Sequence, residues 1–370
     1  MVSALRITCL PSFHALRGAL ANFESEHGFK LVQTSEATLF SSVEWFENLV
    51  QYGITTSAKQ PRQLRLVLVT DSRTGQVACL PLLVQGSVGA LSNYYSGLFA
   101  AMQWQPEAGS LAWRTLDLAL AHALRQQFSG APALCIAPLD SEAPLTTALE
   151  EGLRATGFCV DRYFAFANWY LEVGTMTSLQ YFSTLPASLR TSIERGAKRL
   201  KKAGWRLHIQ QTDDDNLEAS IQSFVSVYNQ SWKDSEPSVD FIPNLIRIAA
   251  TRGWLRLAVI ELDNQPIAAQ LWLVQNGKAY IFKLAFVKGF ERLSPGSVLT
   301  WSLMAHVIDT DKVSQVDYLS GDDHYKKDWM SHRRERIGLV AFDKRSLHGN
   351  WQAVCHFTRK FLQRLRKGKS

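Results

Sequence analysis

The stretch 321-GDDHYKKDW-329 concentrates aspartates, a histidine, a tyrosine and two lysines at one place in the chain. It directly follows 315-QVDYLS-320, whose alternation of apolar and polar residues predicts a β-strand. Side chains of these types can transfer protons or stabilise charge when a strand end holds them together. A solvated turn that caps a helix has the same composition. The elements around the loop therefore decide between a catalytic loop and an ordinary turn.

A second candidate is 292-RLSPGSV-298, where a proline and a glycine lead into a predicted helix over 297–308. The first turn of a helix leaves backbone N–H groups without intrahelical partners, and these groups bind phosphates. Ser-Pro-Gly before a helix is also common turn chemistry. The candidate residues for a phosphate-bearing cofactor are Arg292, Ser294, Gly296 and Ser297.

Two predicted β-hairpins of similar sequence precede these loops in the chain. The first contains RLVLV from Arg65, and the second contains RLAVI from Arg256. A repeat of this length indicates a duplicated domain and not a solenoid. We therefore predict a mixed α/β fold with two lobes, residues 1–170 and residues 171–370. The expected strands are 63–70 and 76–85 in the first lobe, and 255–262, 266–275 and 279–286 in the second.

Helices are expected beside these sheets over 41–53 and 215–232, and two further helices are strongly basic. The helix at 186–204 joins the lobes, and its cations could hold a phosphate-bearing substrate or form a solvated face. The segment 356–370 is an amphipathic basic helix. It could contact a membrane surface, an acyl carrier protein or RNA, or dock its apolar side onto the second lobe.

The composition is that of a folded protein, with 370 residues, 46% of them hydrophobic and 20% charged. The net charge of +7 favours an anionic partner. Five scattered cysteines and nine histidines show no metal-ligand spacing, so neither a disulfide framework nor a metal is expected. The apolar runs are too short to span a membrane, and Pro11 and His14 interrupt any signal-peptide core. A cytoplasmic protein is expected.

The order of hairpin, strand, Pro-Gly-Ser loop, helix, strand and GDDHYKKDW loop is similar to the core of GNAT-type acyltransferases. The segment 254–329 resembles the GNAT-like domain of cellulose-biosynthesis CelD-type proteins, and the likeness extends to 41–53, the first hairpin and 188–204. Related Fem-type aminoacyltransferases have two GNAT lobes and carry an aromatic-lysine pair like Tyr325-Lys326. The resemblance thus implies two tandem GNAT-like lobes joined by the basic helix.

Two features depart from the family pattern. Val287 and Lys288 stand where an acidic residue is common, and the usual phosphate signature is reduced to R-L-S-P-G-S. Both departures concern the region that would receive the donor.

The resemblance implies amide-forming transfer of an acyl group from acyl-coenzyme A (acyl-CoA) or an acyl carrier protein. Such transfer needs a neutral amine, a polarised carbonyl and a protonated leaving group. In these terms Asp322 or Asp317 takes the amine proton, with His324 as an alternative base. Lys326 stabilises the oxyanion or a phosphate, and Tyr325 protonates the leaving thiolate.

Five side chains are the candidates for substrate binding, although the last of them could equally serve packing. They are Arg190, Arg195, Trp232, Lys283 and Trp329.

We therefore predict an N-acyltransferase that acts on an amine of a sugar, lipid, envelope or polysaccharide precursor, with its catalytic site in the C-terminal lobe. The first lobe has no Pro-Gly-Ser loop and is expected to shape the acceptor groove. The alternatives are a Fem-like tRNA-dependent aminoacyltransferase and a non-catalytic scaffold in polysaccharide assembly. A carrier protein, tRNA and the inner membrane face, through 356–370, are candidate partners, and DNA is not.

Overall fold

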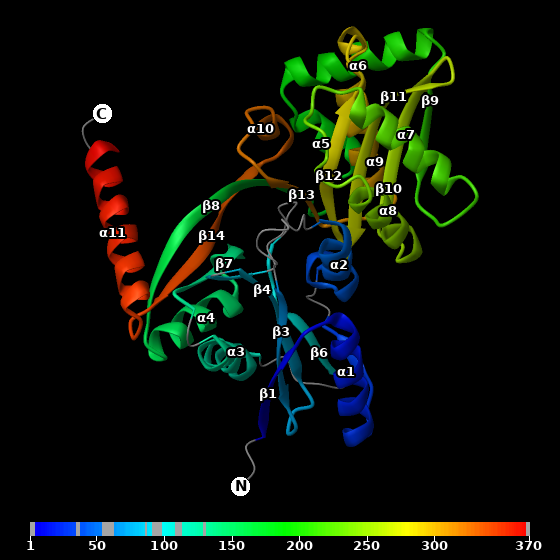
Figure 1. Cartoon of the computed structure of the whole chain (residues 1–370). Helices are drawn as coiled ribbons and strands as arrows, with labels where there is room; N and C mark the ends of the chain where they lie inside the picture. The colour runs from blue at the N-terminus through cyan, green and yellow to red at the C-terminus, as the bar shows by residue number, and fades with distance from the viewer. Residues whose placement is uncertain are drawn as a thin grey trace. The chain divides into compact units, whose positions relative to one another are not determined.

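The computed structural model describes residues 4–34, 38–53, 63–85, 87–90, 98–107, 113–128 and 131–367. The chain divides into two compact units (Figure 1). Unit 1 consists of 1–47, 56–165 and 335–370, and unit 2 of 48–55 and 166–334. The predicted lobes, divided at residue 170, stay a prediction, and the compact units follow different bounds.

Unit 1 is built on a mixed sheet with the strand order β1-β3-β4-β5-β7-β14. Neighbours are antiparallel except for β5 and β7, which are parallel. The elements are β1 (Leu5–Leu10), α1 (Phe13–His27), β2 (Leu31–Gln33), the 3-10 helix η1 (Leu39–Ser41), α2 (Val43–Asn48), β3 (Gln63–Asp71), β4 (Val77–Gln85), β5 (Ser87–Ala90), β6 (Met102–Pro106), α3 (Arg114–Gln127), β7 (Ala133–Asp140), α4 (Pro144–Ala155), β8 (Phe158–Glu172), β14 (His332–Asp343) and α11 (Leu347–Lys367).

Unit 2 has the strand order β8-β13-β12-β11-β10-β9. Its neighbours are antiparallel except for β12 and β13, which are parallel. The elements are the π-helix η2 (Leu49–Gly53), α5 (Ser178–Thr184), α6 (Ala187–Lys202), β9 (Arg206–Gln210), α7 (Leu217–Asn229), α8 (Phe241–Thr251), β10 (Leu255–Leu262), β11 (Gln265–Gln275), β12 (Lys278–Phe286), the 3-10 helix η3 (Glu291–Leu293), α9 (Pro295–Asp309), β13 (Gln315–Ser320) and α10 (Lys326–Trp329).

The two units repeat one topology. The order β1-β3-β4-β5-β7 in unit 1 corresponds to β9-β10-β11-β12-β13 in unit 2, and in both the last pair is the parallel one. The hairpins that resemble each other in sequence, β3–β4 and β10–β11, occupy equivalent places in this order. The predicted duplication and the mixed α/β fold class are confirmed.

The sixth strand of each sheet comes from the other half of the sequence. β8 follows the helices of unit 1 in the chain, but its end from Asn168 to Glu172 pairs with β13 of unit 2. β14 follows unit 2, but pairs with β7 of unit 1 through Arg336–Phe342. Two ion pairs hold β14 in unit 1, Arg336 with Asp140 and Arg125 with Asp343, each at 2.6 Å.

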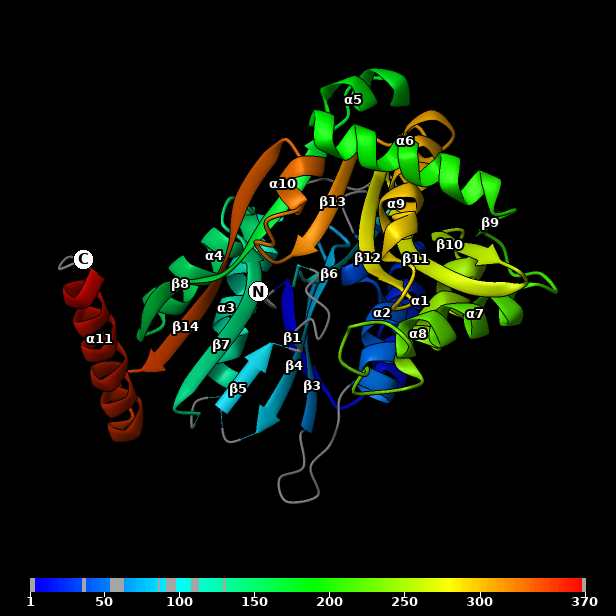
Figure 2. The ribbon, with the colours of Figure 1, turned by 90° about the horizontal axis from the view of Figure 1, so that it is seen from above.

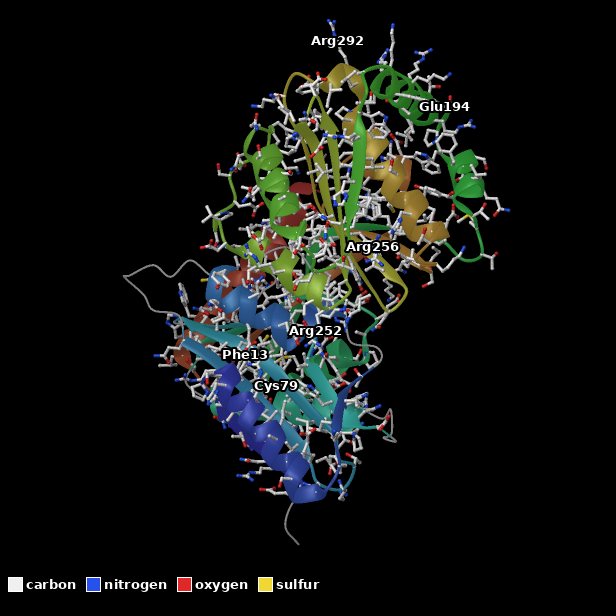
Figure 3. The ribbon with its side chains drawn as sticks, turned by 90° about the vertical axis from the view of Figure 1, so that its right-hand side faces the viewer. Phe13, Cys79, Glu194, Arg252, Arg256 and Arg292 are labelled. Carbon is white, nitrogen blue, oxygen red and sulfur yellow. The ribbon has the colours of Figure 1, made fainter. Side chains whose placement is uncertain are left out.

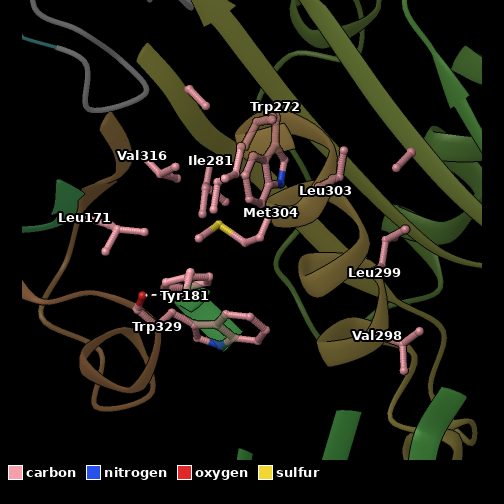
Figure 4. Close-up of a cluster of buried hydrophobic side chains, with 14 of the residues drawn as sticks. Leu171, Tyr181, Trp272, Ile281, Val298, Leu299, Leu303, Met304, Val316 and Trp329 are labelled. Carbon is pink, nitrogen blue, oxygen red and sulfur yellow. Dashed lines mark hydrogen bonds between the residues drawn. The ribbon is translucent and has the colours of Figure 1, made fainter. Parts of the chain in front are cut away.

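In unit 2, helices cover both faces of the sheet (Figure 2). Ala258 and Ile260 of β10 point into the core with α9, whereas the alternate residue Val259 lines a pocket with α7. Trp272, Met304 and Leu299 pack at the centre of the α9 side (Figure 4). This core fixes α9 against β11 and β12.

The closing helix α11 begins at Leu347, earlier than predicted, and belongs to unit 1. Lys360 Nζ donates to both carboxylate oxygens of Asp161 at 2.6 Å, and His356 Nε2 lies 2.8 Å from Asp161 Oδ2. Trp351 and Phe361, in contrast, are 66% and 61% exposed. Within unit 1 the contacts of α11 are therefore made by its polar side.

Candidate active site

Two neighbouring strands of unit 2 diverge where the candidate loops begin. β12 and β13 pair only between Lys278–Tyr280 and Gln315–Asp317. β12 then has one extra residue, Phe282, because Leu271 of β11 pairs with Lys283 and Trp272 pairs with Ile281. The pairing of β13 with β8 also shifts, between Asp317 and Ser320. Because a bulge bends its strand and often lies beside an active site, the carboxyl ends of β12 and β13 separate.

Asp317 holds the irregularity of β13 in place. Its Oδ1 accepts hydrogen bonds from Asn168 Nδ2 and from the backbone N–H of Leu319, both at 2.6 Å. Its Oδ2 accepts from Arg334 Nη2 at 2.7 Å. Leu319 has a φ of 56°, which a non-glycine residue keeps only when its surroundings impose it. Both oxygens of this buried carboxylate have donors, so its contacts are those of a structural residue and not of a free base.

Asp322 is exposed and ion-paired. Arg333 Nη2 donates to its Oδ2 at 2.8 Å, and Trp169 Nε1 donates to its Oδ1 at 2.8 Å. The hydrogen bond from Arg333, followed by that from Trp169, lowers the pKa of Asp322 to about 2. A carboxylate of that pKa is a weak acceptor for an amine proton, so this pairing disfavours the predicted base.

Lys326 is buried and closes the loop from inside. Its Nζ donates to the carbonyl of Ser320, lies 3.0 Å from Asp323 Oδ2 and sits 5.5 Å from the ring centroid of Tyr318. A Cβ at Gly321 would come within 2.8 Å of this Nζ, and Gly321 has a φ of 109° that favours glycine. Glycine thus allows the lysine to reach the strand end, and in this conformation Lys326 ties β13 to α10.

Tyr325 is the exposed aromatic of the same loop. Its ring stands edge-on to that of Tyr318, with the centroids 5.8 Å apart, and 44% of its surface is exposed. Partial burial raises the pKa of Tyr325 to about 12. The phenol is therefore protonated at neutral pH and can donate a proton. His324 beside it is exposed.

The predicted phosphate loop forms the N-terminus of α9. Pro295 is the first helical residue, two positions before the predicted start, and Ser294 is the left-handed N-cap with φ 49°. The N–H groups of Gly296 and Ser297 lie in the first turn, where no intrahelical carbonyl can accept from them. A Cβ at Gly296 would lie 3.3 Å from Phe286 Cδ1 at the end of β12. The helix end and the separating strand therefore meet at a glycine.

The basic helix α6 packs directly on this loop. A Cβ at Gly196 would lie 2.8 Å from the carbonyl oxygen of Leu293, so only glycine permits this approach. Arg199 Nη1 donates to the carbonyl of Arg292 at 2.6 Å, and Ser192 Oγ lies 3.4 Å from Ser294 Oγ. Sequence reasoning did not connect α6 with the loop, although Gly196 within a basic helix was the available signal.

The arginines named from the sequence differ in surroundings. Arg195 and Arg292 are exposed, and Arg292 points away from the body of unit 2 (Figure 3). Arg190 is half-buried, and its Nε has no hydrogen-bond partner. Arg195 and Arg199 are four residues apart on α6 and therefore share a face, so positive charge gathers beside the N-terminus of α9.

A charged cluster surrounds Lys283 of β12 on the α7 side. Lys283 forms an ion pair with Glu236, and its Nζ lies 5.4 Å from the ring centroid of Tyr228. Burial lowers the pKa of Lys233, and repulsion from Lys283 lowers it further. Of this group sequence reasoning named Lys283 alone, because Tyr228 lies at the end of α7 and Lys233 and Glu236 in the segment after it, and neither carries a recognisable motif.

A pocket of about 330 Å³ lies beside the Lys283–Glu236 pair. Its walls are mainly apolar, and Glu236 belongs both to its lining and to the ion pair with the β12 lysine. The lining includes Phe224, Tyr228, Glu236, Val239, Ile242 and Pro243. Such a pocket, with a carboxylate at its edge, fits a ligand that carries both an apolar part and an amine.

The two tryptophans named from the sequence have opposite environments. Trp232 is 47% exposed and packs against Phe286, with the ring centroids 4.4 Å apart. Trp329 is buried, and its carbonyl accepts from Tyr181 Oη at 2.7 Å (Figure 4). Trp329 is therefore a packing residue, and the proposed substrate contact is kept for Trp232. Within the described part of the chain no group of three or more His, Cys, Asp or Glu side chains could hold a metal ion.

The comparisons with known proteins agree with this arrangement. Residues 187–327, which contain α6, the α9 loop and the Tyr325 loop, match the model of the acetyltransferase (GNAT) domain. A search of curated proteins finds no match. The part of the prediction that named the CelD-like type is not confirmed.

Among solved structures, one titled "Crystal structure of FemX" is similar with a TM-score of 0.58 at 11% identity, covering 88% of this chain and 95% of that one. The C-terminal domain of a putative lysylphosphatidylglycerol synthetase from Agrobacterium fabrum gives a TM-score of 0.47 at 14% identity, covering 87% of this chain and 92% of that one. A tandem GNAT protein from the clavulanic acid pathway gives 0.46 at 11% identity, covering 91% and 98%. The last two likenesses are too weak to support an inference. Residues 187–327 are therefore similar to the acetyltransferase (GNAT) domain, and the fold of the whole chain resembles that of FemX across both halves.

Proposed function

We propose that unit 2 transfers an acyl group from acyl-CoA to a primary amine. The observation that carries this proposal is the divergence of β12 and β13 at their two bulges, between the N-terminus of α9 and the exposed phenol of Tyr325. An extended donor molecule fits these two features, because its phosphate can bind at the N-terminus of α9 while its thioester lies near the phenol of Tyr325.

The donor's phosphates are assigned to the first turn of α9. The N–H groups of Gly296 and Ser297 and the helix dipole stabilise negative charge there, with Arg195 and Arg292 nearby. The thioester is placed between the diverging strand ends. An acyl carrier protein, whose phosphopantetheine arm ends in the same thioester, is the variant of this proposal with a protein donor.

The reaction forms a C–N bond between the amine and the thioester carbonyl carbon and breaks the C–S bond. The amine nitrogen loses one proton and the sulfur gains one, so the step is balanced without a further reactant. Tyr325 Oη supplies the proton to the leaving thiolate and recovers one from solvent. Because Asp322 and Asp317 are tied in ion pairs, the proton of the amine is assigned to water.

The acceptor is assigned to the pocket of about 330 Å³ between α7 and α8. Glu236, which is paired with Lys283, lies at the edge of this pocket, where a neutral amine can donate a hydrogen bond to its carboxylate, and the apolar wall of Phe224, Val239 and Ile242 holds the rest of the molecule. Amines of sugars, lipids or envelope precursors are the proposed class. Acyl-CoA is a cytoplasmic metabolite, which is why the enzyme is placed in the cytoplasm.

The first experiment is a thermal-shift and native mass spectrometry titration with coenzyme A, acetyl-CoA and a long-chain acyl-CoA. Gly296→Leu should abolish the stabilisation, because its side chain would fill the space between Phe286 and the helix end. Gly18→Leu is the matched control, since Gly18 lies on a helix with nothing within 4 Å of its Cβ position. If Gly296→Leu binds coenzyme A like the wild type, the donor site is elsewhere.

A second candidate is a tRNA-dependent aminoacyl transfer, and the basic outer face of α6 favours it. Binding of bulk tRNA should then weaken steeply with salt, because each neutralised phosphate releases counterions. Activity with acyl-CoA alone would exclude it. A protein that binds neither donor would be a scaffold.

A further inference from the structure

The closing helix α11 carries basic residues and no acidic ones. From Ser346 to the C-terminus the sequence contains no Asp or Glu. Its sequence contains the cations Arg359, Lys360, Arg364, Arg366 and Lys367. The helix stands apart from the other helices of unit 1 in both ribbon views (Figures 1 and 2).

Five large apolar side chains of α11 share one face. Leu347, Trp351, Val354, Phe361 and Leu365 are spaced so that a helix brings them to the same side. Their exposed fractions are 91%, 66%, 58%, 61% and 49%. The exposed stripe therefore extends over nearly the whole helix.

The opposite side of the helix is the one that unit 1 holds. Asp161 on β8 accepts from Lys360 and lies within hydrogen-bond distance of His356, and the ring of Phe342 is 5.3 Å from that of His356. A helix that docks through its polar side and leaves its apolar side in water has the reverse of the usual arrangement. The exposed apolar face of α11 is therefore available to an apolar or interfacial partner.

We propose that α11 lies in the headgroup region of an anionic lipid surface. A helix of 21 residues is about 30 Å long, and a continuous apolar stripe of that length fits a planar interface. Flanking cations without any acid complement anionic headgroups. None of the described helices is long and apolar enough to cross a membrane, so α11 binds along the surface.

The test is flotation of the full-length protein with vesicles. One set contains phosphatidylcholine only, and the other about one third phosphatidylglycerol. Wild type should float with the anionic vesicles, and the bound fraction should fall with added salt, because salt screens the charges. Binding to the neutral vesicles should be much weaker.

Two substitutions separate lipid binding from folding. Trp351→Gln and Phe361→Gln together should weaken binding at least tenfold, because both aromatic rings leave the interface. Leu179→Gln is the matched control, since Leu179 on α5 is 76% exposed and lies outside α11. It should bind as the wild type does, and thermal unfolding should be unchanged in both the double variant and this control.

Three outcomes would overturn the proposal. The first is no flotation of the wild type, and the second is equal flotation of the double variant. The third is sedimentation of the wild type as a dimer, or as a complex with acyl carrier protein, that the double substitution dissociates. In that outcome neither the wild type nor the double variant binds vesicles. Because the readout is lipid binding, it does not depend on acyl transfer.

Discussion

The exposed ring of Tyr325 stands edge-on to the buried ring of Tyr318, with an interplanar angle of 83°. The aromatic edge restricts where the outer phenol can point, and Tyr318 is itself fixed in the core of unit 2. A proton donor at a strand end must be oriented before the reaction begins. The inner tyrosine therefore positions the outer one.

We expect Tyr325→Phe to lower kcat about 100-fold while the KM for the acyl donor changes little, because general acid catalysis contributes on that order. Steady-state kinetics with the identified acceptor checks this. An unchanged kcat would remove Tyr325 from the mechanism.

The pH dependence follows from the same residue. Because the pKa of Tyr325 is raised to about 12, its acid form persists on the alkaline side of neutrality. We expect kcat to show no fall from this group as the pH rises from 7 to about 10. A fall in kcat near pH 8 that disappears in Tyr325→Phe would contradict the raised pKa of Tyr325.

Asp317 and Asp322 should respond differently to the same substitution. Asp317→Asn leaves Arg334 without its buried partner, which should cost about 3–5 kcal/mol of unfolding free energy. Asp322→Asn affects an exposed pair and should leave both unfolding and turnover nearly unchanged. Denaturant unfolding and kinetics of the two variants distinguish these roles. Loss of turnover in a fully folded Asp322→Asn would restore Asp322 as the base.

Unit 1 contains a buried acid with its own pH signature. Burial raises the pKa of Asp117 on α3 to about 7, although a hydrogen bond from Gln103 opposes this. The folded state therefore binds more protons than the unfolded state between the ordinary pKa of an aspartate and 7. Stability should fall as the pH rises through that window, by up to about 1.4 kcal/mol per pH unit from this group.

Asp117→Asn should remove that slope. The gain in stability of the variant over the wild type should therefore be larger at pH 8 than at pH 5. Thermal unfolding of both proteins across this range is the measurement. A wild-type slope that persists in the variant would assign the effect to another group.

The sequence located the loops of the site but not the tasks of their side chains. Periodicity and turn residues placed the strand before Gly321 correctly and the start of the helix after Ser294 to within two residues, because these signals are local. Asp317 is ion-paired with Arg334 and Asp322 with Arg333, and their further donors Asn168 and Trp169 lie 149 and 153 residues away along the chain. No spacing rule reports such contacts, so sequence reasoning interpreted as bases two acids that are held in ion pairs.

The compact units show the same limit at a larger scale. The repeat of β3–β4 and β10–β11 was visible in sequence and predicted the duplication. Nothing local in β14 indicates that it pairs with β7, since a strand pattern does not name its neighbour.

The exchange of β8 and β14 has a consequence for synthesis on the ribosome. Residues 166–334 of unit 2 emerge as one continuous segment, whereas unit 1 lacks its sixth strand until β14 has been translated. Since domains fold as their segments become available, the second unit can acquire its structure before the first is complete. A chain that ends before Arg336 and has been released from the ribosome should therefore protect residues 166–334 from protease while the amino-terminal half is still digested.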